Sequence, residues 1–548
     1  MQGSVTAMEP IEWWQRPLLW LFGHRPDWRD RCGRLLRRMG NRFYWVLAIL
    51  FALAGASDQF VHPFYKQLSN ANFDWLMRHR PVAYKPDSTI VVIDIDEASL
   101  AALATEFGRW PWPRQVLAEV AAKIEAANAR AVMFDILFAD LDTVNPASDR
   151  AFDRYVASSR VSFFPATRLN PQNDADSQVT VSMLNFAAQD PTVPAAEVNG
   201  QRTIALLPPD FKSIYDSTRT GTNNINPDAD NVLRWYSNYE ILGGYRIPSL
   251  PYRMAQVLGW PLQTRARSLL NWPRSFAPYR TISFADAYHA VTSHDDAFFR
   301  GLADKIVLIG STAPGLNDIK ATPVDHLHPG IYILATAIDN TRNNTFLRPA
   351  HPIWIWGLEL LLLAASARLF SRTDRATYVA KYFVIIPVLL IAVSMLALSR
   401  STLLIDLSVP TAVLLFYFTI SGLFESNSHA FAAGTGIFAH TAQEVSTGRL
   451  QIACLPSSTP RASIESLLLQ PGCPIKLWAP PKSGLGRNWA AQGWVLWRWL
   501  PPRANDSAAP ENFDLQWLEV ASPAAKGGGF SLAQSIVTAA SIQQSELG

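Results

Sequence analysis

Three apolar segments lie close together in the second half of the chain, at residues 353–370, 382–399 and 403–424. Each is about as long as a helix that crosses a bilayer, which needs about 20 mostly apolar residues. A shorter apolar segment at residues 43–57 begins with aromatic side chains and follows an arginine-rich stretch. The sequence therefore predicts a membrane protein with one leading transmembrane helix and three closing ones.

The composition agrees with this prediction. Hydrophobic residues make up 49% of the chain and charged residues only 17%, whereas about 25% of the residues of average soluble proteins are charged. The net charge of +3 is too small to indicate a nucleic-acid partner. The lipid bilayer is the first partner that the sequence predicts.

The first apolar segment has two interpretations. Residues 54–56 read Ala-Gly-Ala, which resembles the small-residue site where signal peptides are cleaved. A long stretch, residues 1–42, precedes the apolar segment, which favours an uncleaved anchor. Either interpretation exports the residues that follow.

Basic residues predict the orientation, because short loops rich in lysine and arginine stay in the cytoplasm. Residues 58–351 are therefore expected outside and 425–548 inside, with both termini cytoplasmic. All three cysteines fall on the cytoplasmic side, so the exported segment is expected to contain no disulfide. The basic residues are Arg25, Arg29, Arg31, Arg34, Arg37, Arg38 and Arg42 before the first segment, and Arg368, Arg372, Arg375 and Lys381 between the second and third; the cysteines are Cys32, Cys454 and Cys473.

One acidic residue, Asp406, is expected inside the fourth apolar segment. A carboxylate at mid-bilayer is costly and often functional. Asp406 lies within one turn of the predicted outer end, where it can reach lipid headgroups, and we favour that interpretation.

The exported segment alternates strand-like and helix-like patterns. Residues 89–95, 130–138 and 305–310 are short apolar runs typical of buried strands. Residues 114–129 and 331–343 repeat apolar side chains at helical spacing. This alternation predicts a three-layer α/β domain with a largely parallel sheet.

Two regions are harder to assign. Residues 167–300 are weakly patterned and are expected to form insertions or a β-rich flank. The C-terminal region is predicted to form a small, mainly-β domain, because strand-like runs occur at residues 450–456, 474–480, 493–501 and 513–521.

Six ordered sequence blocks resemble one known family. They are GRWPWPR (108–114) after IDIDEASL, FDILFAD, GTNNINPDADNVLRWY (221–236), ISFADAYH (282–289), DKIVLIGSTAPGLNDIKATPV (304–324) and HPGIYILATAIDNTRNNTFLRP (328–349). The chain from about residue 60 to 351 resembles the CHASE domain, type two, a sensory extracellular domain of bacterial membrane receptors. One turn departs from the family pattern, because Asp230-Asn231 replaces the usual Asp-Gly; asparagine also tolerates a positive φ.

The resemblance implies a division of the chain. It implies a leading span, an extracytoplasmic sensor domain, three closing spans and a cytoplasmic output domain, in the inner membrane of a bacterium. The expected parts are a cytoplasmic N-terminal segment (1–42), a transmembrane helix (43–60), the sensor domain (61–351), three transmembrane helices (352–424) and a small β-rich domain (425–548).

The heptad GRWPWPR alternates two tryptophans with two prolines. Proline fixes φ and favours extended geometry in the preceding residue, so Trp110 and Trp112 are expected on a stiff segment. Pro113 predicts that a helix begins at Arg114. The tryptophans are expected to cap the edge of the core, or to line a pocket in which Arg109 or Arg114 binds an anion.

Further polar residues are expected at the carboxyl edge of the sheet, where parallel α/β folds bind ligands. Asp94 and Asp96 end the first strand, Asp135 lies on the second, and Ser311 and Thr312 follow a third. Aspartates here can bind Mg²⁺ or Ca²⁺, but helix capping is the commoner role. We expect no metal and no cofactor. The predicted ligand-binding set is Asp94, Asp96, Arg109, Trp110, Trp112, Arg114, Asp135, Ser311 and Thr312.

No motif predicts catalysis. The exported segment lacks a serine-hydrolase elbow and a zinc-protease motif, and the C-terminal region lacks nucleotide-binding and kinase motifs. His326 and His328 are expected on a solvated loop, with metal binding as the alternative. The sequence favours a receptor over an envelope enzyme. Its expected partners are a small-molecule or protein cue outside, an effector protein inside and, as an open alternative, a second copy of the chain.

Overall fold

The computed structural model describes residues 41–275, 277–316, 318–372, 376–432, 449–456, 475–477, 493–500 and 518–520. The chain divides into two compact units. The α/β unit comprises residues 64–351 and 390–408, and the helical unit comprises residues 1–63, 352–389 and 409–548. Most of the N-terminal segment 1–42, together with Cys32 and Cys473, lies outside the described residues.

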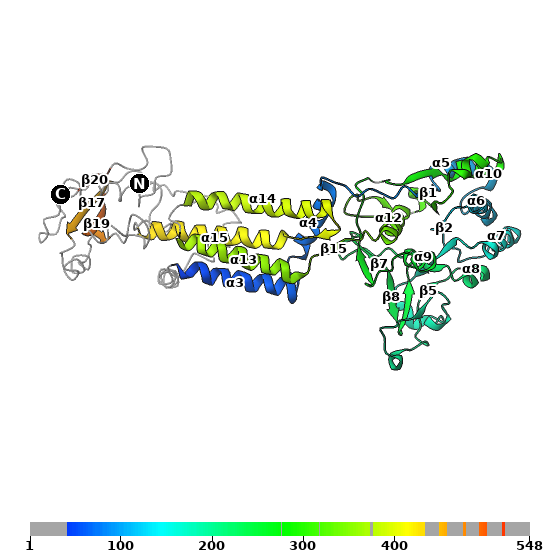
Figure 1. Ribbon diagram of the computed structural model, residues 1–548, viewed down its shortest axis with the longest axis horizontal. Helices are drawn as coiled ribbons and strands as arrows, with labels where there is room; N and C mark the ends of the chain where they lie inside the picture. The colour runs from blue at the N-terminus through cyan, green and yellow to red at the C-terminus, as the bar shows by residue number, and fades with distance from the viewer. Residues whose placement is uncertain are drawn as a thin grey trace, which may run out of the picture. The chain divides into compact units, whose positions relative to one another are not determined.

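A seven-stranded sheet forms the centre of the α/β unit (Figure 1). Its order is β11-β1-β12-β2-β3-β5, and β6 also pairs with β3. All of these pairings are parallel except β3 with β5. The predicted largely parallel sheet is therefore confirmed. The strands are β1 (Ile90–Asp94), β2 (Ala131–Phe134), β3 (Ser162–Arg168), β5 (Leu206–Leu207), β6 (Thr220–Thr222), β11 (Arg280–Ser283) and β12 (Ile306–Gly310).

Helices cover both faces of the sheet, which gives the three predicted layers. Ile90 and Val92 of β1 belong to one buried cluster, and Val91 and Ile93 belong to another. This alternation follows from the two-residue period of a strand. The first face packs against α4 (Lys66–His79), α9 (Leu250–Leu258) and α12 (Gly330–Asn343); the second packs against α5 (Glu97–Phe107), α6 (Arg114–Ala126), α7 (Pro146–Ser158), α8 (Lys212–Ser217), α10 (Phe284–Thr292) and α11 (Asp296–Arg300).

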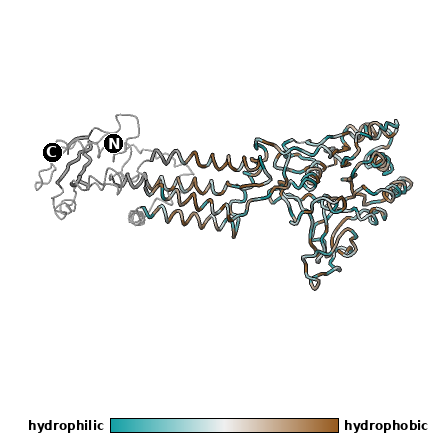
Figure 2. The backbone as a smooth tube through the Cα atoms, viewed as in Figure 1, coloured by the Kyte–Doolittle hydropathy of each residue, from teal (hydrophilic) through white to brown (hydrophobic). Residues whose placement is uncertain are grey.

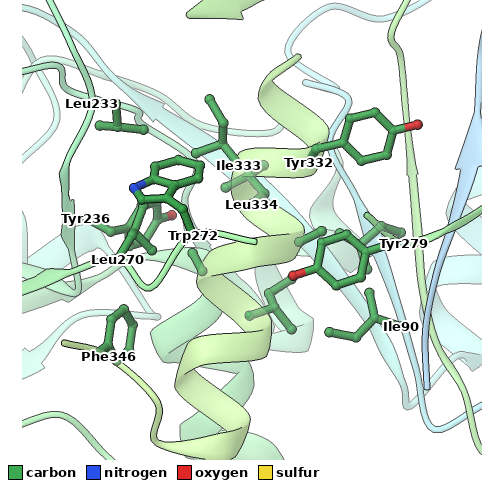
Figure 3. Close-up of a cluster of buried hydrophobic side chains, with 14 of the residues drawn as sticks. Ile90, Leu233, Tyr236, Leu270, Trp272, Tyr279, Tyr332, Ile333, Leu334 and Phe346 are labelled. Carbon is green, nitrogen blue, oxygen red and sulfur yellow. The ribbon is translucent and has the colours of Figure 1, made fainter. Parts of the chain in front are cut away.

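The helix α12 is buried on all sides in its first three turns. Figure 3 shows it between Trp272 on one side and Tyr279 and Ile90 on the other. Its buried Asp339 accepts hydrogen bonds from the hydroxyls of Tyr84 (2.7 Å) and Tyr279 (3.0 Å). The helix predicted at residues 331–343 is therefore confirmed, and the hydrogen bonds to Asp339 satisfy a polar group that it buries.

Short strands form a flank beside the main sheet, as predicted for part of residues 167–300. One small sheet has the order β4-β9-β8, and β7 pairs with β10. Asn231 has a φ of 61°, so the predicted positive φ in the Asp230-Asn231 turn is confirmed. The strands are β4 (Ala188–Gln189), β7 (Trp235–Ser237), β8 (Tyr239–Leu242), β9 (Tyr245–Pro248) and β10 (Arg267–Leu269).

The end of α14 (Ala376–Arg400) belongs to the α/β unit. Leu398 and Leu404 lie in the same buried cluster as β1 and α12. In addition, β15 (Arg348–Pro349) pairs in parallel with β16 (Leu403–Leu404). The segment after α14 is therefore part of the folded domain.

The fourth apolar helix begins later than predicted. The helix α15 (Ser408–Ala432) starts after Asp406, so Asp406 lies in the connection and not inside a span. Its Oδ1 accepts hydrogen bonds from the Ser408 backbone N–H (3.0 Å) and hydroxyl (2.6 Å), and from Asn72 Nδ2 (3.0 Å). Aspartate competes for backbone donors at helix starts, which explains the later boundary.

Long apolar helices dominate the described part of the helical unit (Figure 2). Among the described residues, three helices are long and apolar enough to cross a membrane: Arg42–Phe60 (α3), Pro352–Ser371 in α13 (Pro352–Arg372) and Tyr382–Arg400 in α14. Ser408–Phe424 is a shorter apolar helix.

Four strands of the C-terminal region form an antiparallel sheet of order β18-β19-β17-β20. Three of them lie within the runs that the sequence identified, and β17 begins one residue before the run at 450–456. They are β17 (Arg449–Pro456), β18 (Ile475–Leu477), β19 (Gly493–Leu500) and β20 (Leu518–Val520). The remaining residues from 433 to 548 lie outside the described part of the chain.

Candidate functional site at the carboxyl edge of the sheet

Three adjacent strands bring the predicted polar residues together. Asp94 pairs with Gly310 across β1 and β12, and the Asp135 N–H donates to Ile309 O at 2.8 Å. Because Gly310 has no side chain, Ile331 and Asp135 can pack closely against it. A Cβ there would lie only 2.5 Å from Ile331 Cδ1 and 3.0 Å from Asp135 Cβ. The residues Asp94, Asp135, Ser311 and Thr312 therefore share one edge of the sheet.

Asp94 fastens the loop after β12. Its carboxylate accepts from the Thr312 N–H (2.8 Å) and hydroxyl (2.5 Å). The Ser311 hydroxyl donates to Ile95 O at 2.7 Å. Burial raises the pKa of Asp94 above its ordinary value, although the bonds from Thr312 oppose the shift.

Asp96 caps the following helix. Its Oδ1 accepts from the Ser99 N–H (2.7 Å) and from the Ser283 hydroxyl (3.0 Å). Burial would raise the pKa of Asp96, but these hydrogen bonds outweigh it and lower the pKa. The commoner role expected for an aspartate here, helix capping, is confirmed for Asp96.

Asp135 is the least satisfied carboxylate of this edge. Asn223 Nδ2 donates to it at 3.2 Å, and the negative charge of Asp318 is close enough to affect its protonation. Burial, followed by the charge of Asp318, raises the pKa of Asp135 to about 7. Asp135 can therefore change its charge near neutral pH.

The tryptophans of the heptad lie against the core near this edge. Trp112 is 3% exposed, and its ring lies 5.4 Å from that of Phe284, the residue after Ser283. Trp110 is partly buried and meets Trp112 edge to face at 5.1 Å. The peptide bond between Trp110 and Pro111 is cis. The expected cap of the core is thus present, and pocket lining by these rings stays a prediction.

The described contacts of Arg114 are with residues other than the carboxylates of the edge. Arg114 begins α6, as predicted, and forms an ion pair with Asp149 of α7 at 2.8 Å. It also donates to Asp140 O and lies 5.4 Å from the Phe211 ring centre. Arg109 is exposed. Because Arg114 already has an acidic partner, an anion would have to compete with Asp149 for it.

The histidine pair differs from its expected environment. His326 is exposed, but His328 is 0% exposed, because β14 (His328–Pro329) pairs with β13 (Ile319–Lys320) and packs against Trp272 at 5.6 Å. The prediction of a solvated pair is therefore wrong for His328. Burial lowers the pKa of His328 to about 4, so the ring is neutral at ordinary pH. Among the described residues, no group of three or more His, Cys, Asp or Glu side chains is arranged to hold a metal ion.

Sequence reasoning missed three polar residues of this edge: Ser283, Asn223 and Asp318. Asn223 follows β6, a three-residue strand too short to show a period in the sequence. Asp318 lies against the first residue of α12, where a side chain at Gly330 would clash with its carboxylate. The Gly330 N–H also donates to Asp318 O at 2.9 Å. A glycine at a predicted helix start was the available signal of this close approach.

The fold and the apolar helices define a class: an α/β domain joined in sequence to helices that can cross a membrane. The model of the CHASE2 domain family matches residues 45–370, more than half of the chain. The chain therefore belongs to the CHASE2 family of sensory extracellular domains found in receptors. No curated protein and no solved structure matches it.

Proposed function

We propose that this chain is a multi-pass receptor of the bacterial inner membrane. Its CHASE2 domain senses a small-molecule or protein cue outside the cytoplasm. Four helices, α3, α13, α14 and α15, carry the signal to a cytoplasmic domain that binds an effector protein, and a second copy of the chain is a compatible partner. Membership of a sensory extracellular family and the apolar helices support this proposal.

The candidate sensory site is the carboxyl edge of the sheet, with Trp112 beside it. Its carboxylates and hydroxyls would bind a ligand that donates hydrogen bonds or carries positive charge. Asp135 is the member with the fewest bonds from the protein among the three aspartates described above, so it is the group best placed to bind such a ligand.

The proposed signalling route is based on a set of hydrogen bonds at the outer ends of the helices. The Arg348 N–H donates to Thr402 O and the Ala350 N–H to Leu404 O, both at 2.8 Å. Asn72 of α4 donates to Asp406 at 3.0 Å. These bonds join the segment after the first span, the segment before the second and the connection between the third and fourth. A movement of the domain would therefore reach several spans at once.

We propose no catalytic role for the chain. At the polar edge of the α/β unit, Asp96 caps a helix and Asp94 binds the loop after β12. The C-terminal strands form an antiparallel sheet, which is suited to partner binding. An enzyme acting outside the cytoplasm is the alternative.

The outer hydrogen bonds can be tested with a reporter. Residues 1–432 would be fused to the kinase part of a bacterial sensor histidine kinase and expressed in cells. Asn72→Ala and Asp406→Ala should each change basal kinase activity about fivefold or more, the lower range of ordinary allosteric coupling, because each breaks the bond between α4 and the connection before α15.

The matched controls are Asn173→Ala and Asp176→Ala, which alter exposed residues of the flank. They should leave kinase activity unchanged. Equal activity in all four variants, at equal expression, would contradict the proposed route.

A further inference from the structure

A carboxylate lies on the buried side of the second apolar helix. Glu359 is 0% exposed, and it shares one face of α13 with Ile355, Leu363 and Ala367, all of them buried. It is the eighth residue of the helix, so it lies about 10 Å inside the helix end, at 1.5 Å per residue. The sequence analysis did not identify this residue.

The helix α3 provides the space for this side chain. Its buried face carries Ala48, Ala52 and Gly55, small residues that let two membrane helices approach closely. A Cβ at Gly55 would overlap with Glu359 Oε1. One turn away, Trp356 Nε1 donates to Ala52 O at 3.0 Å and fixes the two helices in this register.

A second carboxylate lies on the same buried face of α3, one turn from Gly55. Asp58 follows Gly55 on α3, is 7% exposed and has an interaction of its own. Glu359 differs, because within the described part of the chain neither of its carboxylate oxygens has a hydrogen-bond partner. Two buried acids thus face one seam, and only one of them is satisfied.

Among the described residues, no cation donates a hydrogen bond to the carboxylate of Glu359. Apart from Asp58 and Glu359, the ionisable residues on the described side chains of α3, α13 and α15 lie toward the opposite ends of these helices. Tyr417, for example, donates to Tyr44 O at 3.1 Å. The others are Arg42, Tyr44 and Arg368.

An isolated charge in this position is expensive. A charged side chain at the centre of a membrane helix costs about 2.5–3.5 kcal/mol on insertion scales, and two neighbouring carboxylates disfavour each other's ionisation. A neutral carboxyl group avoids both costs. We propose that Glu359 and Asp58 form a proton-binding site between α3 and α13, in which Glu359 carries the proton at neutral pH.

Proton release would weaken the seam. An ionised Glu359 near Asp58 would need water or a cation, and Glu359 is 0% exposed in this packing. The helices α3 and α13 would then have to separate locally. The site depends on these helices lying in a membrane and not on what the CHASE2 domain senses.

Infrared spectroscopy of the full-length protein in lipid bilayers tests this proposal. Un-ionised carboxyl groups have a carbonyl stretch that carboxylates lack. We expect part of this band at neutral pH to disappear in Glu359→Gln and to remain in the exposed control Glu97→Gln. Asp135 also contributes to the band, so the difference between variant and wild type makes the assignment.

A second variant tests the pair and does not depend on the folding of Glu359→Gln. In Asp58→Asn the neighbouring acid is gone, so Glu359 should lose its proton at a lower pH than in the wild type. An unchanged titration would overturn the pairing. An unchanged band in folded Glu359→Gln would show that Glu359 is ionised and would overturn the site. Loss of the wild-type band on adding sodium at constant pH would show that the site binds sodium and would overturn the proposal that it binds a proton.

Discussion

Replacing Trp112 with alanine is expected to lower the free energy of unfolding of the α/β unit by about 3–5 kcal/mol, the usual cost of removing a large buried aromatic side chain. Trp112 is almost fully buried, and its ring packs between Trp110 and Phe284. Its loss would leave a cavity where α6 and α10 meet. Chemical denaturation of the full-length protein, followed by tryptophan fluorescence, measures the change.

The matched control is Trp110→Ala, in the same heptad. Trp110 is only partly buried, so its replacement should cost clearly less. If both variants lose the same stability, the cap does not depend on Trp112. Arg114→Gln is not a neutral comparison, because it removes the ion pair with the buried Asp149.

Replacing Arg234 with alanine is expected to cost about 3–5 kcal/mol, as when one partner of a buried ion pair is removed. Arg234 is 4% exposed and binds both oxygens of Asp74 at 2.8 Å. It also pairs with Asp230 at 2.9 Å and with Asp228 at 3.5 Å. The variant would leave the partly buried Asp74 and Asp228 without this cation and would remove the ion pair between Arg234 and α4.

Arg267→Ala is the control for Arg234. Arg267 also pairs with Asp228, at 3.4 Å, but its side chain is 50% exposed. An exposed pair contributes about 0–1 kcal/mol, so this variant should unfold nearly as the wild type does. Thermal unfolding of both variants in detergent compares them. Equal midpoints would mean that burial does not determine how strongly the ion pairs of Arg234 stabilise the fold.

The centre of the sheet could be predicted because β1, β2 and β12 are buried on both faces. Parallel strands of this kind appear as continuous apolar runs, as at residues 90–94 and 306–310. The residues Asp94, Asp135 and Thr312 could be assigned to one edge because parallel strands end at a common edge. Short strands such as β6 left no pattern, so Asn223 was missed.

Contacts between distant segments could not be predicted. The partner of Arg114 is Asp149 on α7, a helix that the sequence analysis did not assign. His328 is buried by a two-residue strand pair, which has no sequence signature. Glu359 was visible in an apolar segment, but its burial depends on which face of α13 meets Gly55. The sequence analysis singled out Asp406 as the acidic residue inside an apolar segment, but the structure places it before α15.

The side of the membrane on which each part lies tests the account most directly. A single cysteine replacing the exposed Ser293 should react with a membrane-impermeant maleimide in intact cells from which any outer membrane has been removed. The native Cys454, on β17, should react only after lysis. Protection of residue 293 together with labelling of Cys454 in intact cells would contradict the proposed receptor.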